Sequence, residues 1–164
     1  MRPFAGGIRL AVPQDYPALA RLWHEAWHDG HAHAVPADLL RHRGPDFFTA
    51  EMQRIGPACH VWEGLYGAEG FVTTTGRWID RLFVSQPARG GGIAGRLMAH
   101  AEDLLRANGH AEGWTDALVG NDRALRFYQR QGWQQDRIAE IDVPTPDGPI
   151  PLRTRILRKG LTDE

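Results

Sequence analysis

Residues 82–97 read Leu82-Phe83-Val84-Ser85-Gln86-Pro87-Ala88-Arg89-Gly90-Gly91-Gly92-Ile93-Ala94-Gly95-Arg96-Leu97. An apolar strand here runs into a turn of three consecutive glycines, and this turn opens directly into an amphipathic helix. Glycine lets a backbone approach a ligand without side chains in the way, and a helix start offers unpaired N–H groups and a positive dipole end. The stretch therefore predicts a phosphate-binding turn, beside which Arg89 adds a full positive charge.

This turn matches neither of the two common phosphate-binding loops. A P-loop ends in Gly-Lys-Ser or Gly-Lys-Thr, whereas this turn continues as Ala94-Gly95-Arg96. Gly90, Gly92 and Gly95 formally satisfy the dinucleotide pattern G-x-G-x-x-G, but that pattern belongs after the first strand of a parallel βαβ unit. Here three hairpin-like strands precede the glycines. A glycine-rich turn that binds no ligand is the alternative interpretation.

A second patterned segment runs from Asn121 to Trp133 and reads NDRALRFYQRQGW. Asn121 predicts a helix N-cap, and helical spacing places Ala124 and Tyr128 on the same face as Asn121. Phe127 points to another face and is expected in the core. The alternative is that Asn121 only caps the helix and that Tyr128 only packs, since aromatic residues at helical spacing are usually core.

The periodicity of apolar residues predicts the remaining elements. Helices are expected over 15–30, 36–43, 46–54 (with Asp46 as its cap), 93–108 and 121–131, and strands over 8–12, 59–66, 70–75, 78–84, 114–119, 133–143 and 150–156. The order β-α-α-α-β-β-β-α-β-α-β-β indicates an α/β fold with a mixed sheet and helices on its faces. Pro149 and Pro151 place the last strand toward a sheet edge.

Composition narrows the class of protein without identifying a function. The chain has 164 residues, 42% of them hydrophobic, with 19 basic and 20 acidic side chains and a formal charge of -1. We expect one globular domain over residues 1–164 with no nucleic-acid partner. Cys59 is the single cysteine and fits a reducing compartment. The chain shows neither a signal-peptide core nor the roughly 18 apolar residues that cross a bilayer, so we expect a cytoplasmic protein with no membrane partner.

The two patterned segments together resemble the GCN5-related N-acetyltransferases (GNAT). Arg89-x-x-Gly92-x-Ala94 resembles that family's (Q/R)-x-x-G-x-(G/A) motif, and residues 121–133 resemble its N-x-x-A-x-x-F-Y-x-x-x-G-F pattern, with Trp133 in place of the last phenylalanine. The resemblance covers nearly the whole chain. It implies a GNAT-like, mostly antiparallel sheet of about seven strands flanked by helices, with a V-shaped cofactor gap between the fourth and fifth strands.

What this resemblance implies for function is an acetyl-CoA-dependent N-acetyltransferase, in which a primary amine attacks the thioester directly in a ternary complex. In the family, the amides of the glycine turn hold the pyrophosphate of coenzyme A, the preceding strand contacts the pantetheine arm, and the asparagine lies beside that arm. The cofactor contacts implied are Leu82, Phe83, Val84, Arg89, Gly90, Gly91, Gly92, Ile93, Ala94, Gly95 and Asn121.

Catalytic roles follow from the chemistry that such a transfer needs. A backbone amide near Phe83 and Val84 is expected to stabilise the oxyanion, and Tyr128 to protonate the leaving thiolate, since a phenol has a pKa near 10. Asp80 is the expected general base, with Asp116 as the alternative. Deprotonation through water, with no single base, stays open beside them.

The acceptor is expected to be a small-molecule or peptide amine. By position in the family, Trp27, His28 and His31 are expected to bind it, in a segment with Trp23 and His33 nearby. The C-terminal hairpin is a candidate edge for a homodimer. A non-catalytic acyl-CoA-binding module is the first rival hypothesis.

The second rival is a zinc hydrolase, because His24-Glu25-Ala26-Trp27-His28 satisfies the H-E-x-x-H pattern. A metzincin would need glycine and histidine at positions 31 and 34, and the chain has His31 and Ala34 there. We therefore expect no metal cofactor.

Overall fold

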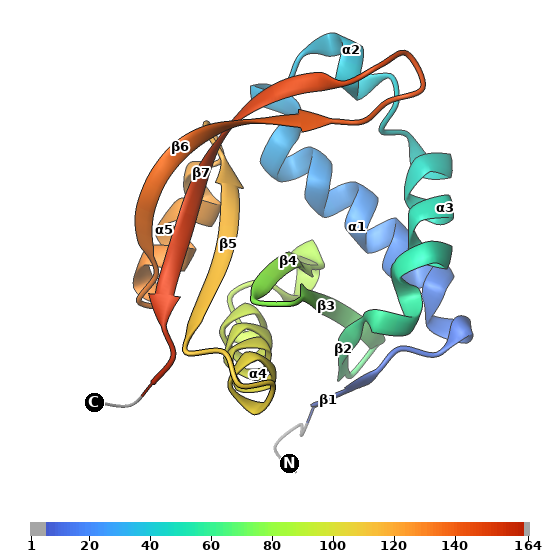
Figure 1. The fold of residues 1–164 in the computed structure, drawn as a ribbon. Helices are drawn as coiled ribbons and strands as arrows, with labels where there is room; N and C mark the ends of the chain where they lie inside the picture. The colour runs from blue at the N-terminus through green and yellow to red at the C-terminus, as the bar shows by residue number, and fades with distance from the viewer. Residues whose placement is uncertain (1–5, 163–164) are drawn as a thin grey trace.

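The computed structural model describes residues 6–162, which form one seven-stranded sheet with helices on both faces (Figure 1). The strands are β1 (Gly7–Leu10), β2 (His60–Gly64), β3 (Gly67–Thr75), β4 (Trp78–Val84), β5 (Glu112–Leu118), β6 (Gln134–Val143) and β7 (Ile150–Gly160). The α-helices are α1 (Tyr16–His31), α2 (Ala37–Leu40), α3 (Pro45–Ile55), α4 (Ile93–Ala107) and α5 (Asp122–Arg130). Short 3-10 helices join them: η1 (Pro13–Asp15), η2 (Ala32–Ala34), η3 (Gly56–Ala58) and η4 (Gln86–Ala88).

The order of helices and strands is the one that the sequence predicts, with small differences at the ends. One predicted cap is wrong: α3 begins at Pro45 with Gly44 as its N-cap, and Asp46 lies in the first turn. Proline suits the first helical position because its missing N–H would be unpaired there anyway. Asp46 still stabilises this helix start, because a carboxylate in the first turn faces the positive end of the dipole.

The sheet has the strand order β1-β2-β3-β4-β5-β7-β6 and is antiparallel except where β4 meets β5. These two strands run parallel, and Trp78 of β4 pairs with Trp114 of β5. Among the residues that the structure describes, β4 and β5 form no further register pair beyond this one. The mixed, mostly antiparallel sheet and the opening between the fourth and fifth strands are thereby confirmed.

The prediction that the last strand lies at a sheet edge is wrong, because β7 lies between β5 and β6. The two prolines are tolerated for a local reason. β5 pairs with β7 only from Thr154 to Gly160, whereas Pro151 pairs with Asp142 of β6. Pro151 therefore lies in a stretch of β7 that has one neighbouring strand, where a missing N–H breaks no bond to β5.

A bulge in β4 changes the direction of its side chains. Thr73 is opposite Arg81 and Thr74 is opposite Ile79, so Asp80 has no partner on β3. Such an extra residue interrupts the alternation of a strand. As a result Ile79 and Leu82, three residues apart, both contact the core cluster beneath α4.

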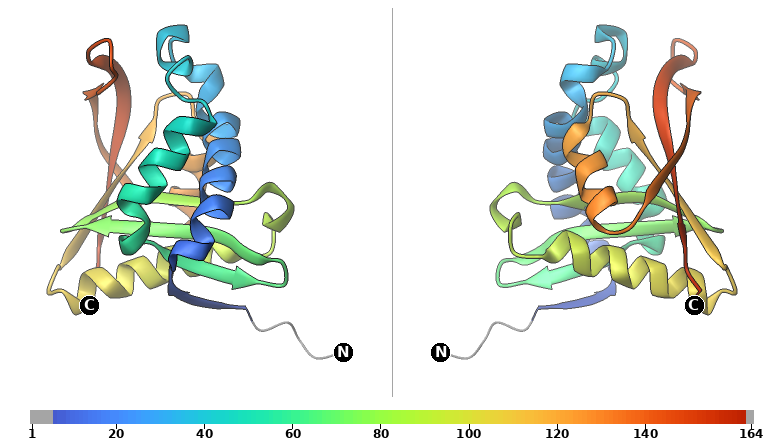
Figure 2. Two further views of the ribbon diagram at one scale, coloured as in Figure 1. Left: turned by 90° about the vertical axis from the view of Figure 1, so that its right-hand side faces the viewer. Right: turned by 90° about the vertical axis from the view of Figure 1, so that its left-hand side faces the viewer.

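Two apolar clusters hold helices on opposite faces of the sheet (Figure 2). One contains Leu97, Met98 and Leu105 of α4 together with Tyr128 of α5, and the other contains Trp23 of α1 and Phe48 of α3. No helix within residues 6–162 is long and apolar enough to cross a membrane.

A partly buried ion pair joins α4 to β7. The Lys159 ammonium donates to the Glu102 carboxylate at 2.8 Å and to the Gln131 carbonyl at 2.7 Å. Trp133 Nε1 also donates to Glu102, at 3.2 Å. Because Glu102 is only 6% exposed, these bonds compensate a carboxylate that is removed from water.

Candidate active site

The glycine turn after β4 adopts the backbone that its sequence requires. Gly90 and Gly92 have φ of 85° and 81°, in the left-handed region that residues with a Cβ rarely adopt. Gly92 is the N-cap of α4, which begins at Ile93. The strand-turn-helix arrangement predicted from residues 82–97 is therefore present.

The backbone of this turn is a ready anion site. Within residues 6–162, the N–H groups of residues 90–95 donate to no protein acceptor, and the first backbone bond of the helix is from Arg96 N–H to Gly92 O. These free donors coincide with the positive end of the α4 dipole. A pyrophosphate fits this set of donors.

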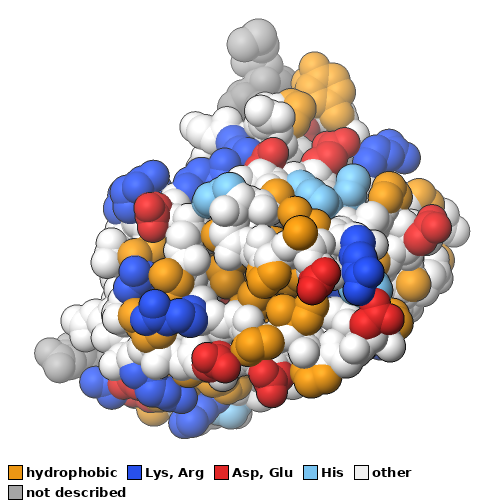
Figure 3. Space-filling view, turned by 90° about the horizontal axis from the view of Figure 1, so that it is seen from above, with side chains coloured by type: hydrophobic (Ala, Val, Ile, Leu, Met, Phe, Trp, Pro, Cys, Tyr) orange, Lys and Arg blue, Asp and Glu red, His pale blue; other side chains and the backbone are white. Residues whose placement is uncertain are grey.

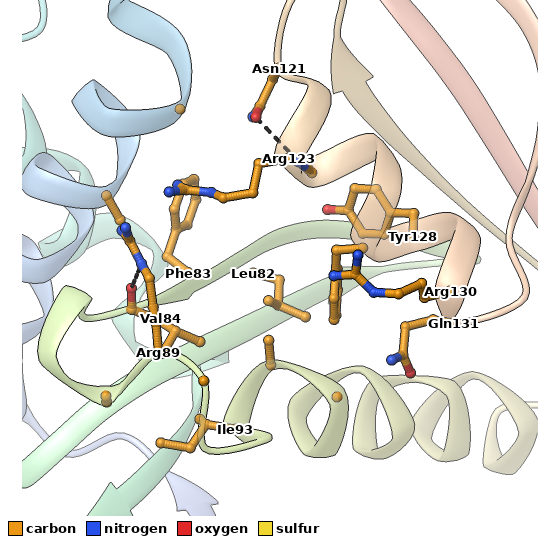
Figure 4. A pocket seen from close by; sticks show the side chains of 18 of the residues that line it. Leu82, Phe83, Val84, Arg89, Ile93, Asn121, Arg123, Tyr128, Arg130 and Gln131 are labelled. Atoms are coloured by element: carbon orange, nitrogen blue, oxygen red, sulfur yellow. Dashed lines mark hydrogen bonds between the residues drawn. The ribbon is translucent and has the colours of Figure 1, made fainter.

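A cavity of about 460 Å³ lies beside the turn, between β4, α4, α5 and the end of α1 (Figure 4). Its lining includes most of the residues that the resemblance implied as cofactor contacts. They are Leu82, Phe83, Val84, Arg89, Gly90, Gly92, Ile93, Ala94, Gly95 and Asn121. Gly91 lies within the turn but does not line this cavity.

Asn121 closes one end of the cavity with α1. Its Oδ1 accepts from Ala124 N–H at 3.3 Å, so the predicted N-cap is present. A Cβ added at Gly30 would lie 3.0 Å from Asn121 Nδ2, so glycine lets α1 approach this turn closely. His33 Nε2 and Gly120 O, 2.9 Å apart, strengthen the same contact.

Tyr128 directs its phenol toward the cavity from α5 (Figure 4). Burial raises the pKa of Tyr128 to about 12, against an opposing hydrogen bond with Thr115. The phenol is therefore less acidic than the pKa near 10 expected from sequence. It stays protonated at neutral pH and can donate a hydrogen bond or a proton into the cavity.

The two aspartates proposed as bases are outside this lining. Asp80 is in the β4 bulge, where its Oδ2 accepts a hydrogen bond from the Thr75 hydroxyl. Asp116 is on β5, opposite Ile156 of β7. Both lie two residues beyond the tryptophans that pair β4 with β5.

Arg89 is not a free cation beside the turn. Its Nε donates to Val84 O at 3.4 Å, and its guanidinium forms an ion pair with Asp29 of α1 at 3.2 Å. Arg89 thereby joins the glycine turn to α1 across the mouth of the cavity. Part of its charge is compensated before any anion arrives.

Arg123 and Arg130 line the cavity although sequence reasoning did not single them out. They stand with Phe127 at positions i, i+4 and i+7 of α5, which share one face of a helix. That spacing could have identified them. Burial, followed by the nearby Arg89, lowers the pKa of Arg123. Phe127, expected in the core, both packs against the core cluster and lines the cavity.

Of the three residues expected to bind the acceptor, only His31 lines the cavity. His31 stacks on Trp27, with centroids 5.0 Å apart and planes 2° apart. Burial lowers the pKa of His31 to about 4, so its imidazole is neutral at physiological pH. His28 Nε2 is 2.7 Å from the carbonyl oxygen of Arg43, and neither His28 nor Trp27 lines the cavity.

The H-E-x-x-H pentapeptide places His24 and His28 edge to face, with ring centroids 4.6 Å apart. Among the described residues, no three histidine, cysteine, aspartate or glutamate side chains come together as metal ligands. The Nε2 atom of His28 is also engaged by Arg43 O.

Comparison with known proteins gives consistent results. The sequence model of the acetyltransferase (GNAT) family matches residues 16–133. The chain is 28% identical over 141 residues to the peptidyl-lysine N-acetyltransferase YjaB of Salmonella typhimurium, covering 82% of this chain and 88% of that protein. Its structure is similar to apo YjaB from Escherichia coli (TM-score 0.68, 19% identity, 94% and 97% of the two chains). It is also similar to YncA from Salmonella typhimurium, solved with acetyl-CoA (TM-score 0.67, 18% identity, 98% and 96% of the chains).

Proposed function

The chain belongs to the acetyltransferase (GNAT) family and is an acyltransferase, and from this premise we propose that it transfers an acetyl group from acetyl-CoA to a primary amine by direct attack in a ternary complex. The observation that carries this proposal is the row of N–H groups over residues 90–95, which have no acceptor within residues 6–162 and lie beside a cavity of about 460 Å³. The related YncA binds acetyl-CoA, which supports the same co-substrate here.

The donor would be held mainly by backbone groups. The amides of residues 90–95 would hold the pyrophosphate, with Arg123 and Arg130 adding charge from α5. Leu82, Phe83 and Val84 would contact the pantetheine arm, because this part of β4 lies beyond its pairing with β5. Acetyl-CoA supplies the acetyl group as a thioester.

The chain's own residues would then polarise the thioester and manage the protons. A backbone N–H of Phe83 or Val84 would donate to the carbonyl oxygen, which becomes more negative as the amine attacks. Tyr128 would hold its proton near the sulfur and deliver it to the departing thiolate. A carboxylate, Asp80 or Asp116, or a water chain would accept the proton of the acceptor ammonium.

The acceptor is proposed to bind beside the aromatic segment of α1 with Trp27, His28 and His31, of which His31 lines the cavity itself. Seen from above, hydrophobic side chains gather near the centre of the molecule, with histidine and charged side chains around them (Figure 3). The relative YjaB is named for action on peptidyl-lysine, which supports a lysine-like amine. Both a small amine and a peptide side chain fit this description.

Cellular location and assembly are part of the same proposal. Burial raises the pKa of the Cys59 thiol to about 11, so this cysteine stays protonated and unreactive, as suits a reducing cytoplasm. β6 is an edge strand of the sheet and is the proposed edge for a homodimer.

An acceptor screen tests the function directly. Purified protein is mixed with acetyl-CoA and a panel of lysine peptides, polyamines and free amino acids, and free thiol and product mass are measured. We expect thiol release that depends on one class of amine, with a mass gain of one acetyl group on that amine. Acetyl-CoA binding without transfer to any amine would instead indicate a binding module, and absence of binding would overturn the proposal.

A further inference from the structure

The parallel pairing of β4 with β5 stops after a single register pair. Trp114 N–H donates to Arg77 O at 2.9 Å, and this bond belongs to the pair of Trp78 with Trp114. In a parallel ladder, every second N–H of a strand points to the same neighbour. Asp116 N–H is therefore the next donor in line, and the Ile79 carbonyl is the acceptor that it would use. Within residues 6–162 the two strands form no second pair, so the ladder does not reach this step.

A side chain takes the place of this missing backbone bond. The Thr115 hydroxyl donates to Ile79 O at 2.9 Å, and Thr115 is only 2% exposed. A buried carbonyl needs at least one donor. The hydroxyl supplies that donor without requiring the two strands to stay at ladder spacing. Thr115 thus satisfies the Ile79 carbonyl at the point where the strands separate.

This bond lies next to the proposed donor cavity. On β4, the lining of the cavity begins at Leu82, three residues after Ile79. From α5, Tyr128 lines the same cavity, and a hydrogen bond with Thr115 opposes the rise in the Tyr128 pKa that burial causes. The Thr115 hydroxyl can stabilise an ionised phenol, because rotation about its C–O bond directs its one proton from Ile79 O to the phenolate.

We propose that Thr115 is a positioning residue for the acetyl transfer proposed above, on which this inference rests: its hydroxyl ends the β4–β5 ladder at Ile79 and holds the strands apart where the donor opening begins. Without this hydroxyl, Asp116 N–H would bond to Ile79 O and extend the ladder by one step toward Leu82. The thioester would then be displaced from the phenol of Tyr128. A displacement of about 1 Å can cost roughly 10²-fold in rate.

Amide hydrogen exchange tests the structural step without donor or acceptor. Thr115→Val keeps the β-branched shape and removes only the hydroxyl. In ¹⁵N-labelled protein, the Asp116 amide should exchange roughly 10-fold more slowly in Thr115→Val than in wild type, because it gains a bond to Ile79 O. A threonine that only stabilises the fold would give the opposite sign, since its loss speeds exchange. Thr115→Ser keeps the hydroxyl and should exchange as wild type does.

Steady-state kinetics, with the acceptor class found in the screen, test the functional step. Thr115→Val should lower kcat by roughly 10–10²-fold. The KM for acetyl-CoA should change only within a few-fold, because the turn at residues 90–95 still holds the pyrophosphate. Thr115→Ser should keep kcat close to that of wild type. Thr154→Val is the matched control for both measurements, because Thr154 is a buried threonine of β7 whose hydroxyl also donates to a backbone carbonyl, that of Leu152.

The two measurements separate this inference from the proposed function. If Asp116 exchange slows in Thr115→Val but wild type acetylates no amine, the proposed function fails and the role of Thr115 in strand separation holds. If Asp116 exchange is unchanged or faster in Thr115→Val, or if kcat stays at the wild-type value, the inference is overturned. A loss of kcat that Thr115→Ser shares overturns it as well. Should Thr115→Val fail to fold, Thr115→Ala removes the same hydroxyl and is judged by the same two measurements.

Discussion

His31 and Trp27 are stacked one helical turn apart with nearly parallel rings, and His31 Nδ1 lies 3.0 Å from the Trp27 carbonyl oxygen. The contact holds a neutral imidazole against the cavity, because burial lowers the pKa of His31 to about 4. Protonation of this ring would place a charge in a desolvated position near Arg123. The stack is therefore most stable when His31 carries no charge.

A dependence of stability on pH follows from this pKa. The unfolded chain binds a proton at His31 near pH 6.5, but the folded chain binds it only near pH 4, so stability falls as the pH falls between these values. At pH 4.5 the loss relative to pH 7 should be about 2–3 kcal/mol from this residue. Urea unfolding of wild type and His31→Phe at both pH values measures it. Phenylalanine keeps a ring on Trp27 but does not titrate, so equal pH dependence in both proteins would contradict the prediction.

The phosphate role of the glycine turn is tested at Gly91, where φ is not in the left-handed region and a Cβ meets only Ala88 O at 3.6 Å. Gly91→Glu adds a negative charge beside the free amides and should lower acetyl-CoA affinity by at least roughly 100-fold, about 3 kcal/mol. Gly91→Ala is the matched control and should bind within a few-fold of wild type. Calorimetry with both variants measures the difference. Unchanged affinity in Gly91→Glu would show that the anion binds elsewhere.

Arg123 should strengthen donor binding through its charge. Arg123→Gln is expected to weaken acetyl-CoA binding by about 1–3 kcal/mol and to reduce its dependence on salt concentration, as loss of one charge-assisted contact does. Arg126 is on the same helix but does not line the main cavity, so Arg126→Gln is the control. Titrations at two salt concentrations give both quantities. If both substitutions weaken acetyl-CoA binding equally, the arginines act through the overall positive charge of α5, and Arg123 makes no direct contact with the donor.

Tyr128→Phe removes the phenol hydroxyl but keeps the ring and its packing. Turnover should fall by roughly 10²–10⁴-fold with acetyl-CoA affinity nearly unchanged, because the proton source for the thiolate is lost. Tyr16 is also a buried tyrosine, but it begins α1 and does not line the cavity, so Tyr16→Phe should leave turnover unchanged. Steady-state kinetics and thermal unfolding are measured together. A collapse in stability, or full activity in Tyr128→Phe, would assign the residue to packing alone.

Local signals account for the parts of the site that the sequence could predict. Glycines at 90 and 92, the cap at Asn121 and the strand ending at Val84 each depend on a few neighbouring residues, and their backbone follows from local chemistry. The resemblance of the two motifs to the family then predicted which residues line the cavity.

Long-range contacts account for what the sequence did not predict. The ion pair of Arg89 with Asp29 joins residues 60 positions apart, and the low pKa of His31 results from burial by distant elements. β7 lies inside the sheet because it pairs with β5, and the positions of its prolines do not predict this long-range pairing.

The ion pair of Lys159 has a consequence for self-modification. Lys159 is the one lysine of the chain, and every other member of its 19 basic residues is an arginine, whose guanidinium stays protonated. The Lys159 ammonium is bonded to Glu102 and Gln131, so it lacks the free lone pair that attacks a thioester. The side chains of this acyltransferase therefore offer no lysine amine that competes with its acceptor, and incubation with its own donor should leave Lys159 unacetylated in a peptide mass map.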